Sequence, residues 1–277
     1  MEKRPPGREK LRECLERIYE EYNRRELIHP DPLEFLWRYR STADREIAGL
    51  VASGLAYGRV GQILRSTEKV LGLLGPSPSE TLAGLPEEEL LLALGDFRHR
   101  FTTAPEMASL LSSAASIQRE WGLMGNLLGS LMAEGPYETA LDGFTRAILN
   151  GAGLDRCSLL PRPARGSACK RLHLYMRWMV RSDDVDPGGW EAISPSVLMV
   201  PLDVHMYRLS LGLGFTERKT ATRLTAMDAT GGFRRINPDD PVKYDFSLTR
   251  MGIQGRQSDD LFGELLREHC RFIDTGH

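Results

Sequence analysis

The sequence predicts an all-α protein, and three features of its pattern support this fold class. Apolar residues recur three and four positions apart in nearly every periodic segment, which is the spacing of a helix with one buried face. No segment alternates apolar and polar residues in the way that a half-buried strand does. Glycine or proline bounds most of the periodic segments, so each has the length of an ordinary globular helix, about 8 to 20 residues.

The first half of the chain is expected to form a series of helices. Residues 8–26 have apolar positions at intervals of four, three and four, which predicts the first helix, and residues 1–10 are expected to be a flexible tail. Pro30 and Pro32 then break the pattern, and Asp44 is a candidate N-cap of the next helix. The helical segments expected further along are 63–74, 86–95, 104–120, 123–133 and 137–150.

The second half is expected to contain more loop. Residues 151–166 are rich in Gly, Pro and Arg, and a strong helix is predicted over residues 167–181. Residues 182–202 are expected to be irregular because prolines and a pair of glycines interrupt them. The last predicted helices cover 204–213, 217–230, 238–252 and 258–273.

Composition places the chain among ordinary globular proteins. Its 277 residues contain 36 Lys and Arg against 38 Asp and Glu, and 41% are hydrophobic. This balance excludes a disordered chain, a collagen and a disulfide-stapled miniprotein. No apolar run approaches the ~20 residues of a membrane-spanning helix, and the charged N-terminus lacks the apolar core of a secretory signal. We therefore expect a cytoplasmic protein without a membrane partner.

Charge is unevenly distributed along this nearly neutral chain. Residues 80–96 contain five acidic residues and no Lys or Arg, whereas residues 155–181 contain seven basic residues and one acidic residue. A protein polarised in this way can hold a polyanion on one face. The four cysteines have neither a C-x-x-C pair nor the spacing of a zinc ribbon, so no metal or cofactor is expected.

Two segments carry most of the candidate chemistry. In Gly166-Ser-Ala-Cys-Lys170, the lysine follows a glycine turn and enters the first turn of a helix, where backbone N–H groups can meet a phosphate. A solvated basic face on a core helix explains the same residues. In Val200-Pro-Leu-Asp203, the aspartate falls at a helix N-cap. A plain cap is the simple interpretation, but a cap that faces a cleft is also a fixed anion.

Together these segments resemble the core of the helix-hairpin-helix DNA glycosylases. In that superfamily a hairpin ends in a Gly-x-x-x-Lys-like turn, which carries the nucleophile of bifunctional members, and an aspartate follows in a Pro-Val-Asp-x-His-like step. Pro201-Leu-Asp203-Val-His205 is similar to the 8-oxoguanine glycosylase form of that step, and the spacing is similar to the archaeal branch. Over roughly residues 11–255 the chain resembles a bacterial family of unassigned function.

The resemblance has three departures. Arg162-Pro-Ala-Arg165 stretches the hairpin turn, which weakens its grip on a phosphate. No cysteine cluster lies near the C-terminus, so the iron–sulfur form is excluded. Tyr57-Gly-Arg59 stands where members often place Gln or Asn, which leaves the damaged base unspecified.

The resemblance implies a two-lobed glycosylase-like helical fold within a single all-α domain over residues 11–277. One lobe, a helical barrel with the hairpin, would cover residues 45–180, and the other would combine residues 11–44 with 181–277. It also implies base-excision repair: a DNA glycosylase, with AP lyase activity, that removes an oxidised purine such as 8-oxoguanine. The substrate would be damaged duplex or single-stranded DNA.

The resemblance also assigns roles to individual residues. Lys170 would attack C1′ of a nucleotide flipped out of the stack, helped toward its neutral form by cationic neighbours. Asp203 would stabilise oxocarbenium-like charge or assist proton transfer. Tyr57 would be the wedge that fills the gap in the DNA, although a place in the core explains it equally well. The expected DNA contacts are Arg165, Gly166, Ser167, Arg171, Arg177, Tyr57, Arg59 and Lys243, and the expected base-pocket residues are His173, Trp190 and His205.

Two other functions remain open at this point. A non-catalytic nucleic-acid-binding protein that retains the glycosylase fold would have the same basic face, with Lys170 paired to a carboxylate or blocked from a pocket. A helical interaction protein would use Asp203 only as a cap and Lys170 only as a surface charge. That protein would show no spatial separation of the acidic and basic segments.

Overall fold

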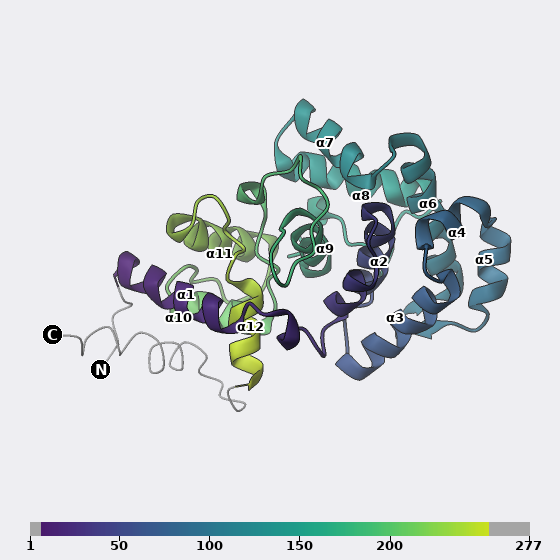
Figure 1. The fold of residues 1–277 in the computed structure, drawn as a ribbon. Helices are drawn as coiled ribbons and strands as arrows, with labels where there is room; N and C mark the ends of the chain where they lie inside the picture. The colour runs from purple at the N-terminus through teal and green to yellow at the C-terminus, as the bar shows by residue number, and fades with distance from the viewer. Residues whose placement is uncertain (1–6, 255–277) are drawn as a thin grey trace. The chain divides into compact units, whose positions relative to one another are not determined.

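The computed structural model describes residues 7–254, and this part of the chain is mostly helical, which confirms the all-α fold class (Figure 1). No helix in it is long and apolar enough to cross a membrane. The α-helices are α1 (Arg8–Tyr22), α2 (Thr42–Gly54), α3 (Val60–Leu74), α4 (Pro78–Gly84), α5 (Glu87–Leu94), α6 (Ala104–Trp121), α7 (Met124–Glu134), α8 (Tyr137–Gly151), α9 (Lys170–Val180), α10 (Val204–Gly212), α11 (Arg223–Ile236) and α12 (Asp245–Gln254). The short elements are the 3-10 helices η1 (Arg25–Leu27), η2 (Pro32–Arg38), η3 (Pro163–Arg165) and η4 (Pro195–Val197), and the strands β1 (Arg98–His99) and β2 (Thr102–Thr103).

The chain divides into two compact units. The first contains the described parts of Met1–Leu27 and Ser194–His277, together with Ala168–His173. The second contains Ile28–Ser167 and Leu174–Ile193. These bounds differ from the lobes that the resemblance implies, because residues 28–44 and 181–193 belong with residues 45–167. The first turn of α9 belongs with the C-terminal helices.

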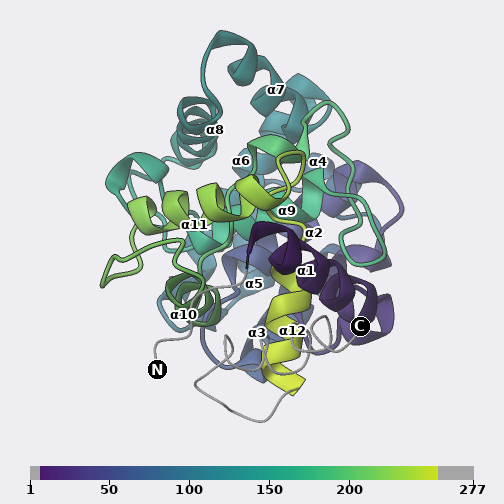
Figure 2. The same cartoon turned by 90° about the vertical axis from the view of Figure 1, so that its left-hand side faces the viewer.

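In the first unit, α1 and α12 pack side by side, and α10 and α11 complete the cluster (Figure 2). Leu11, Leu15 and Ile18 form the buried face of α1, as the spacing of its apolar residues predicts. Phe233 of α11 and Tyr244 add aromatic rings to this core, with centroids 6.5 Å apart. The unit therefore joins segments from both ends of the described chain around a common apolar core.

In the second unit, α2 contacts η2, α3, α4 and α6. The side chain of Ser41 caps α2 by accepting a hydrogen bond from the backbone N–H of Asp44. From Glu46 to Gly54 every residue of the helix is buried. Gly49 allows close approach by α9, because a Cβ at this position would lie 2.9 Å from the Tyr175 ring. Helix α2 is therefore the central core helix of this unit.

Several elements differ from the prediction. The hairpin of β1 and β2 was not expected, because two residues per strand are too few to show an alternating pattern. Helix α11 begins later than predicted, since Thr222 and Thr225 form a capping box. Helix α12 begins only at Asp245, after a turn that contains Pro241. The helix predicted over residues 258–273 lies outside the described residues.

Candidate active site

Lys170 follows a turn with two left-handed residues. Gly166 ends η3 with a φ of +79°. Cys169 has a φ of +46° although it is not glycine, and its side chain is buried. At a residue other than glycine, left-handed backbone costs about 1–3 kcal/mol and tends to cluster at functional sites. Lys170 is the next residue and the first of α9.

Asp203 is the N-cap of α10, as its place in the sequence predicts. Its Oδ1 accepts a hydrogen bond of 2.8 Å from the backbone N–H of Met206. The extended segment before it is fixed to α11, because the buried Val200 donates its backbone N–H to the hydroxyl of Thr230 at 3.0 Å. One oxygen of the Asp203 carboxylate is therefore held by the cap, and Oδ2 points to a different partner.

That partner is Lys170, although 33 positions separate the two residues in the sequence. Lys170 Nζ lies 3.6 Å from Asp203 Oδ2. The Lys170 side chain is 39% exposed and the Asp203 side chain is 18% exposed. Both residues belong to the first unit. The structure thus brings together an amine and a carboxylate that solvent can reach, which are the groups that amine-nucleophile chemistry requires.

The two predicted pocket histidines have different environments. His173 lies three residues after Lys170 on α9 and is buried, and its Nδ1 has no hydrogen-bond partner. Burial lowers the pKa of His173 to about 4, so the ring is neutral near pH 7. His205 is exposed on α10. Within residues 7–254, no group of three or more His, Cys, Asp or Glu side chains could hold a metal ion.

Seven of the eight predicted DNA-contact residues are exposed or half-buried, and only Arg177 is buried. Five of these seven are Arg59, Arg165, Gly166, Ser167 and Arg171. Arg165 has a protein partner, since its Nη2 donates to the backbone carbonyl of Asp155 at 3.2 Å and lies 3.3 Å from the Asp155 carboxylate. Exposed ion pairs contribute only about 0–1 kcal/mol, so a phosphate could replace this partner. These five residues remain candidates for contact with DNA.

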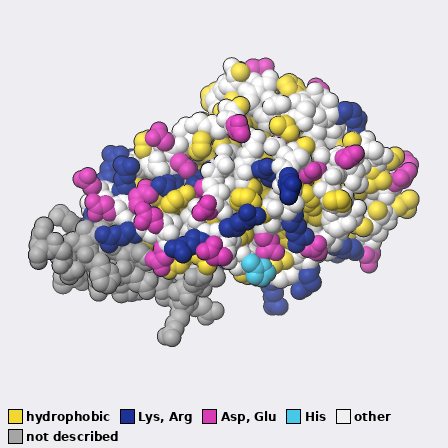
Figure 3. Space-filling view, in the orientation of Figure 1, with side chains coloured by type: hydrophobic (Ala, Val, Ile, Leu, Met, Phe, Trp, Pro, Cys, Tyr) yellow, Lys and Arg dark blue, Asp and Glu magenta, His cyan; other side chains and the backbone are white. Residues whose placement is uncertain are grey.

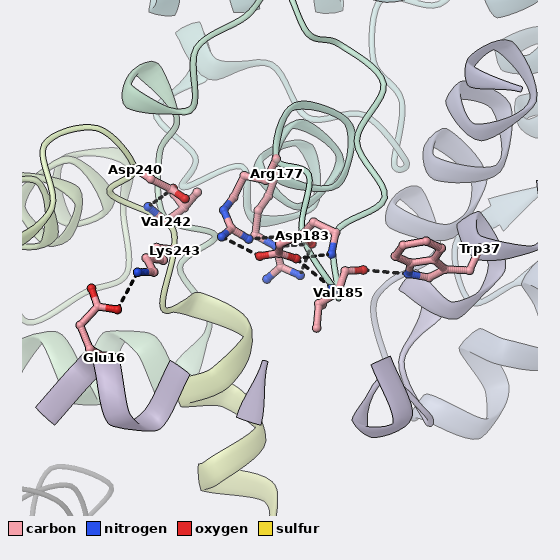
Figure 4. Close-up of polar contacts among 10 residues, drawn as sticks. Glu16, Trp37, Arg177, Asp183, Val185, Asp240, Val242 and Lys243 are labelled. Carbon is pink, nitrogen blue, oxygen red and sulfur yellow. Dashed lines mark hydrogen bonds and ion pairs between the residues drawn. The ribbon is translucent and has the colours of Figure 1, made fainter. Parts of the chain in front are cut away.

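The prediction that Arg177 contacts DNA is wrong, because its guanidinium is buried in an ion-pair network (Figure 4). Arg177 Nη2 lies 3.2 Å from Oδ1 of the fully buried Asp186, and Arg181 binds the same carboxylate. Asp183 pairs with Arg181 and accepts two backbone N–H groups from the loop that follows α9. The charge of Arg177 therefore fixes this loop and is not presented to a phosphate.

Lys243 also has a structural partner in place of DNA. Its Nζ lies 2.6 Å from Glu16 Oε2 (Figure 4). The same Nζ lies 4.5 Å from the centroid of the Tyr19 ring. Burial alone would raise the pKa of Glu16, but hydrogen bonds from Lys243 and Tyr244 lower it overall. The contact fastens α1 to the segment before α12 within the first unit.

Trp190 belongs to the core of the second unit, so its assignment to a base pocket is wrong. Trp190 is buried, and its Nε1 donates to Glu46 at 2.6 Å. The fully buried Glu46 also accepts from the Gln118 side chain and from the backbone N–H groups of Met124 and Gly125, which begin α7. Sequence reasoning missed this role of Glu46. The available signal was a carboxylate at the start of an otherwise apolar helical run.

Tyr57 supports the β-hairpin and does not project as a wedge. Its hydroxyl donates to the backbone carbonyl of His99 at 2.7 Å and lies 2.8 Å from the hydroxyl of Thr102. The Tyr57 and His99 rings also pack edge to face, with centroids 4.7 Å apart. Because both ends of the side chain are engaged, the assignment of Tyr57 as a wedge is not supported by its geometry.

Comparison with known proteins identifies a family for this chain. A family model described as "Protein of unknown function (DUF2400)" matches residues 31–254, a range that includes both Lys170 and Asp203. Comparison with curated proteins and comparison with solved structures each gave no match. The family description assigns no activity to these residues.

Proposed function

The chain belongs to the DUF2400 family of proteins of unknown function, and we propose that it is a base-excision DNA glycosylase with AP lyase activity. The proposed substrate is DNA that contains an oxidised purine such as 8-oxoguanine. In this proposal the fold is a two-lobed variant of the helix-hairpin-helix glycosylases, and no cofactor takes part. The observation that carries the proposal is the distance of 3.6 Å between Lys170 Nζ and Asp203 Oδ2.

The proposed reaction uses the two oxygens of Asp203 for different tasks. Lys170 must attack as a neutral amine, so it first gives up a proton. In this proposal Oδ2 of Asp203 accepts that proton after closing the present 3.6 Å separation from Lys170 Nζ, while Oδ1 stays bound to the backbone N–H of Met206. A single aspartate can therefore hold its position through the cap and still act as a base.

Bond changes at C1′ would follow from this deprotonation. The nitrogen lone pair forms a bond to C1′, the glycosidic bond breaks, and its electron pair leaves with the base, which takes up a proton. The sugar ring opens when O4′ leaves C1′ and takes a proton, which gives a protonated Schiff base on Lys170. Loss of a C2′ proton then expels the 3′ phosphate, and this elimination is the lyase step.

A purely structural ion pair is the second candidate role for Lys170 and Asp203. A non-catalytic nucleic-acid-binding protein would use the pair to join the first turns of α9 and α10, and a partly exposed pair contributes only about 0–1 kcal/mol. The left-handed backbone of the buried Cys169 favours catalysis, because a structure tolerates such a cost where it must place the next side chain.

Borohydride trapping tests the proposal, because borohydride reduces a Schiff base to a stable covalent adduct. Labelled oligonucleotides would carry 8-oxoguanine or other base lesions. We expect an adduct with the wild-type protein and none with Lys170→Gln. Lys219→Gln is the matched control, since Lys219 is an exposed lysine of the same unit and should leave the adduct unchanged.

Asp203→Asn separates catalysis from capping. Asparagine is as good an N-cap as aspartate, so the melting temperature should hold, while loss of the base should slow adduct formation by about 10²- to 10⁴-fold. Base release that needs Asp203 but gives no adduct would overturn the lyase step and leave a monofunctional glycosylase. Neither release nor adduct, with DNA binding intact, would overturn catalysis in favour of the binding role.

A further inference from the structure

An exposed aromatic side chain stands at the tip of the β-hairpin in the second unit. Phe101 is 74% exposed, and among the large apolar side chains that residues 7–254 leave exposed it is the one aromatic. Arg98 pairs with Thr103 and His99 with Thr102, so Arg100 and Phe101 form a two-residue turn. An aromatic ring held in water on a turn offers a flat apolar surface that a ligand can cover.

The base of this hairpin is fixed by a buried hydrogen-bond network. His99 is fully buried, with Nδ1 2.9 Å from the hydroxyl of Ser66 and Nε2 3.0 Å from the backbone carbonyl of Tyr57. On the other strand, the hydroxyl of Thr102 lies 2.8 Å from that of Ser158. Because both strands are anchored, the tip is presented in a defined position and loses little conformational freedom when a ligand binds.

The turn carries a cation at a position that favours glycine. Arg100 has a φ of +54°, and a positive φ at the first residue of a two-residue hairpin turn is typical of a type II′ turn, where glycine is preferred. The Arg100 guanidinium lies 5.8 Å from the ring centroids of both Tyr57 and Phe101. The chain thus tolerates backbone strain and keeps a positive charge beside the exposed ring.

More cations surround the hairpin. Arg98, Arg65 and Lys69 are exposed and line a hollow on the surface between β1 and α3. Asp96 lines the same hollow and pairs with Lys69 at 3.1 Å, so it offsets part of this charge. Arg59, at the N-cap of α3, is also exposed. In Figure 3 dark blue side chains gather over α3, at the lower right of the molecule. Arginines around one exposed ring form a surface complementary to a polyanion with flat bases.

We propose that residues 98–103 bind DNA, with Phe101 stacked on an unpaired base and with Arg98 and Arg100 in contact with the flanking phosphates. Stacking on an aromatic ring tolerates every base, because each base has a π-face, and the arginines supply attraction to the backbone. A protein partner would have to neutralise the arginines around the ring, which DNA does with its own phosphates. This inference shares DNA as the ligand with the proposed function but does not depend on the chemistry of Lys170.

Fluorescence anisotropy with a labelled single-stranded oligonucleotide tests this binding site. We expect Phe101→Ala to weaken binding by about 5- to 100-fold, which is the range for loss of one stacked base. Phe101→Trp should restore it. Leu92→Ala is the matched control, because Leu92 is 81% exposed on α5 and its removal should leave binding unchanged.

The outcomes separate this inference from the proposed function. Wild-type affinity in Phe101→Ala overturns the hairpin site, even if borohydride trapping through Lys170 succeeds. Loss of binding in Phe101→Ala supports the site, even if no lesion gives an adduct. Tighter binding of RNA than of DNA with the same sequence would overturn the assignment to DNA. A Phe101→Ala protein that changes only its oligomeric state would show that the ring binds another copy of the chain.

Discussion

His173 combines deep burial with an unsatisfied ring nitrogen, and this sets how the residue responds to pH. Its Nδ1 has no hydrogen-bond partner, and burial lowers its pKa to about 4 from an ordinary value of about 6.5. The folded protein therefore holds the neutral ring, whereas the unfolded chain takes up a proton more readily. Acidification must then favour the unfolded state.

We predict that His173 destabilises the protein by about 2 kcal/mol when the pH falls from 7 to 5. The pKa of His173 is lower in the folded protein than in the unfolded chain. The free energy of unfolding therefore carries no penalty from His173 above about pH 6.5, and the penalty grows as the pH falls toward about 4. Urea denaturation at both pH values, with wild type and His173→Gln, measures this difference. His205→Gln is the control, since His205 is exposed. If the free energy of unfolding depends on pH equally in wild type and in His173→Gln, the predicted effect of His173 is contradicted.

Local signals could place some residues at turns and caps, although the N-cap of α2 is Ser41 and not the predicted Asp44. They could not reveal partners from distant parts of the chain. The glycine turn before Lys170 and the cap at Asp203 were visible because each depends on a few neighbouring residues. Arg177 and Trp190 had equally suggestive places in the sequence, yet they pair with buried carboxylates. The spacing of apolar residues along a helix does not show where a buried carboxylate from another part of the chain will lie.

At the scale of elements, apolar spacing predicted most of the described helices but missed the short α4, and the ends of helices were less predictable. The first half of the chain has glycines and prolines close to the true ends of α5, α6, α7 and α8. Helix α11 was misplaced because its start depends on Thr222, whose capping role the apolar pattern does not show. The β-hairpin was missed because its two-residue strands are too short to show alternation, and the side chains that stabilise it, Tyr57 and Ser158, come from outside the hairpin.

Helix α7 allows a paired test of how the second unit is packed. A Cβ on Gly125 would lie 2.5 Å from the Trp190 ring, whose position is fixed by its hydrogen bond to Glu46. We predict that Gly125→Ala lowers the free energy of unfolding by about 1–3 kcal/mol through overpacking. Gly129→Ala, four residues along the same helix, has no atom within 4 Å of the added Cβ and should raise stability by up to about 1 kcal/mol. The urea midpoints of the two variants, each compared with wild type, measure this difference in stability. Equal shifts of the two midpoints would contradict the prediction.

At the scale of the whole molecule, charge is informative only when its distribution is known. The net charge of −2 excludes attraction of DNA by overall charge. In the sequence, the basic segment 155–181 was therefore the feature that suggested DNA binding. Part of that segment proves to be internal, because Arg177 and Arg181 neutralise Asp186 in the core. The exposed cations around the hairpin come instead from two separate stretches of sequence, residues 59–69 with Arg59, Arg65 and Lys69 and residues 98–100 with two arginines, so no run of charge marks them.

We therefore predict that DNA affinity depends on these local cations and not on net charge. Contact of four phosphates by the arginines around the hairpin would give a slope of log affinity against log salt of about −3 to −4. Arg98→Gln should reduce the size of this slope by about 1.

Glu120→Gln changes the net charge by the same amount in the opposite direction. Glu120 is exposed near the far end of α6, which begins directly after β2. It therefore lies about 25 Å along the helix from the hairpin, beyond the ~8–10 Å over which salt screens charge. Glu120→Gln should leave both affinity and slope close to wild type in anisotropy titrations from 50 mM to about 200 mM salt. If Arg98→Gln and Glu120→Gln change DNA affinity by equal amounts in opposite directions, net charge governs binding. A local binding site would instead respond to the nearby arginine and not to the distant glutamate.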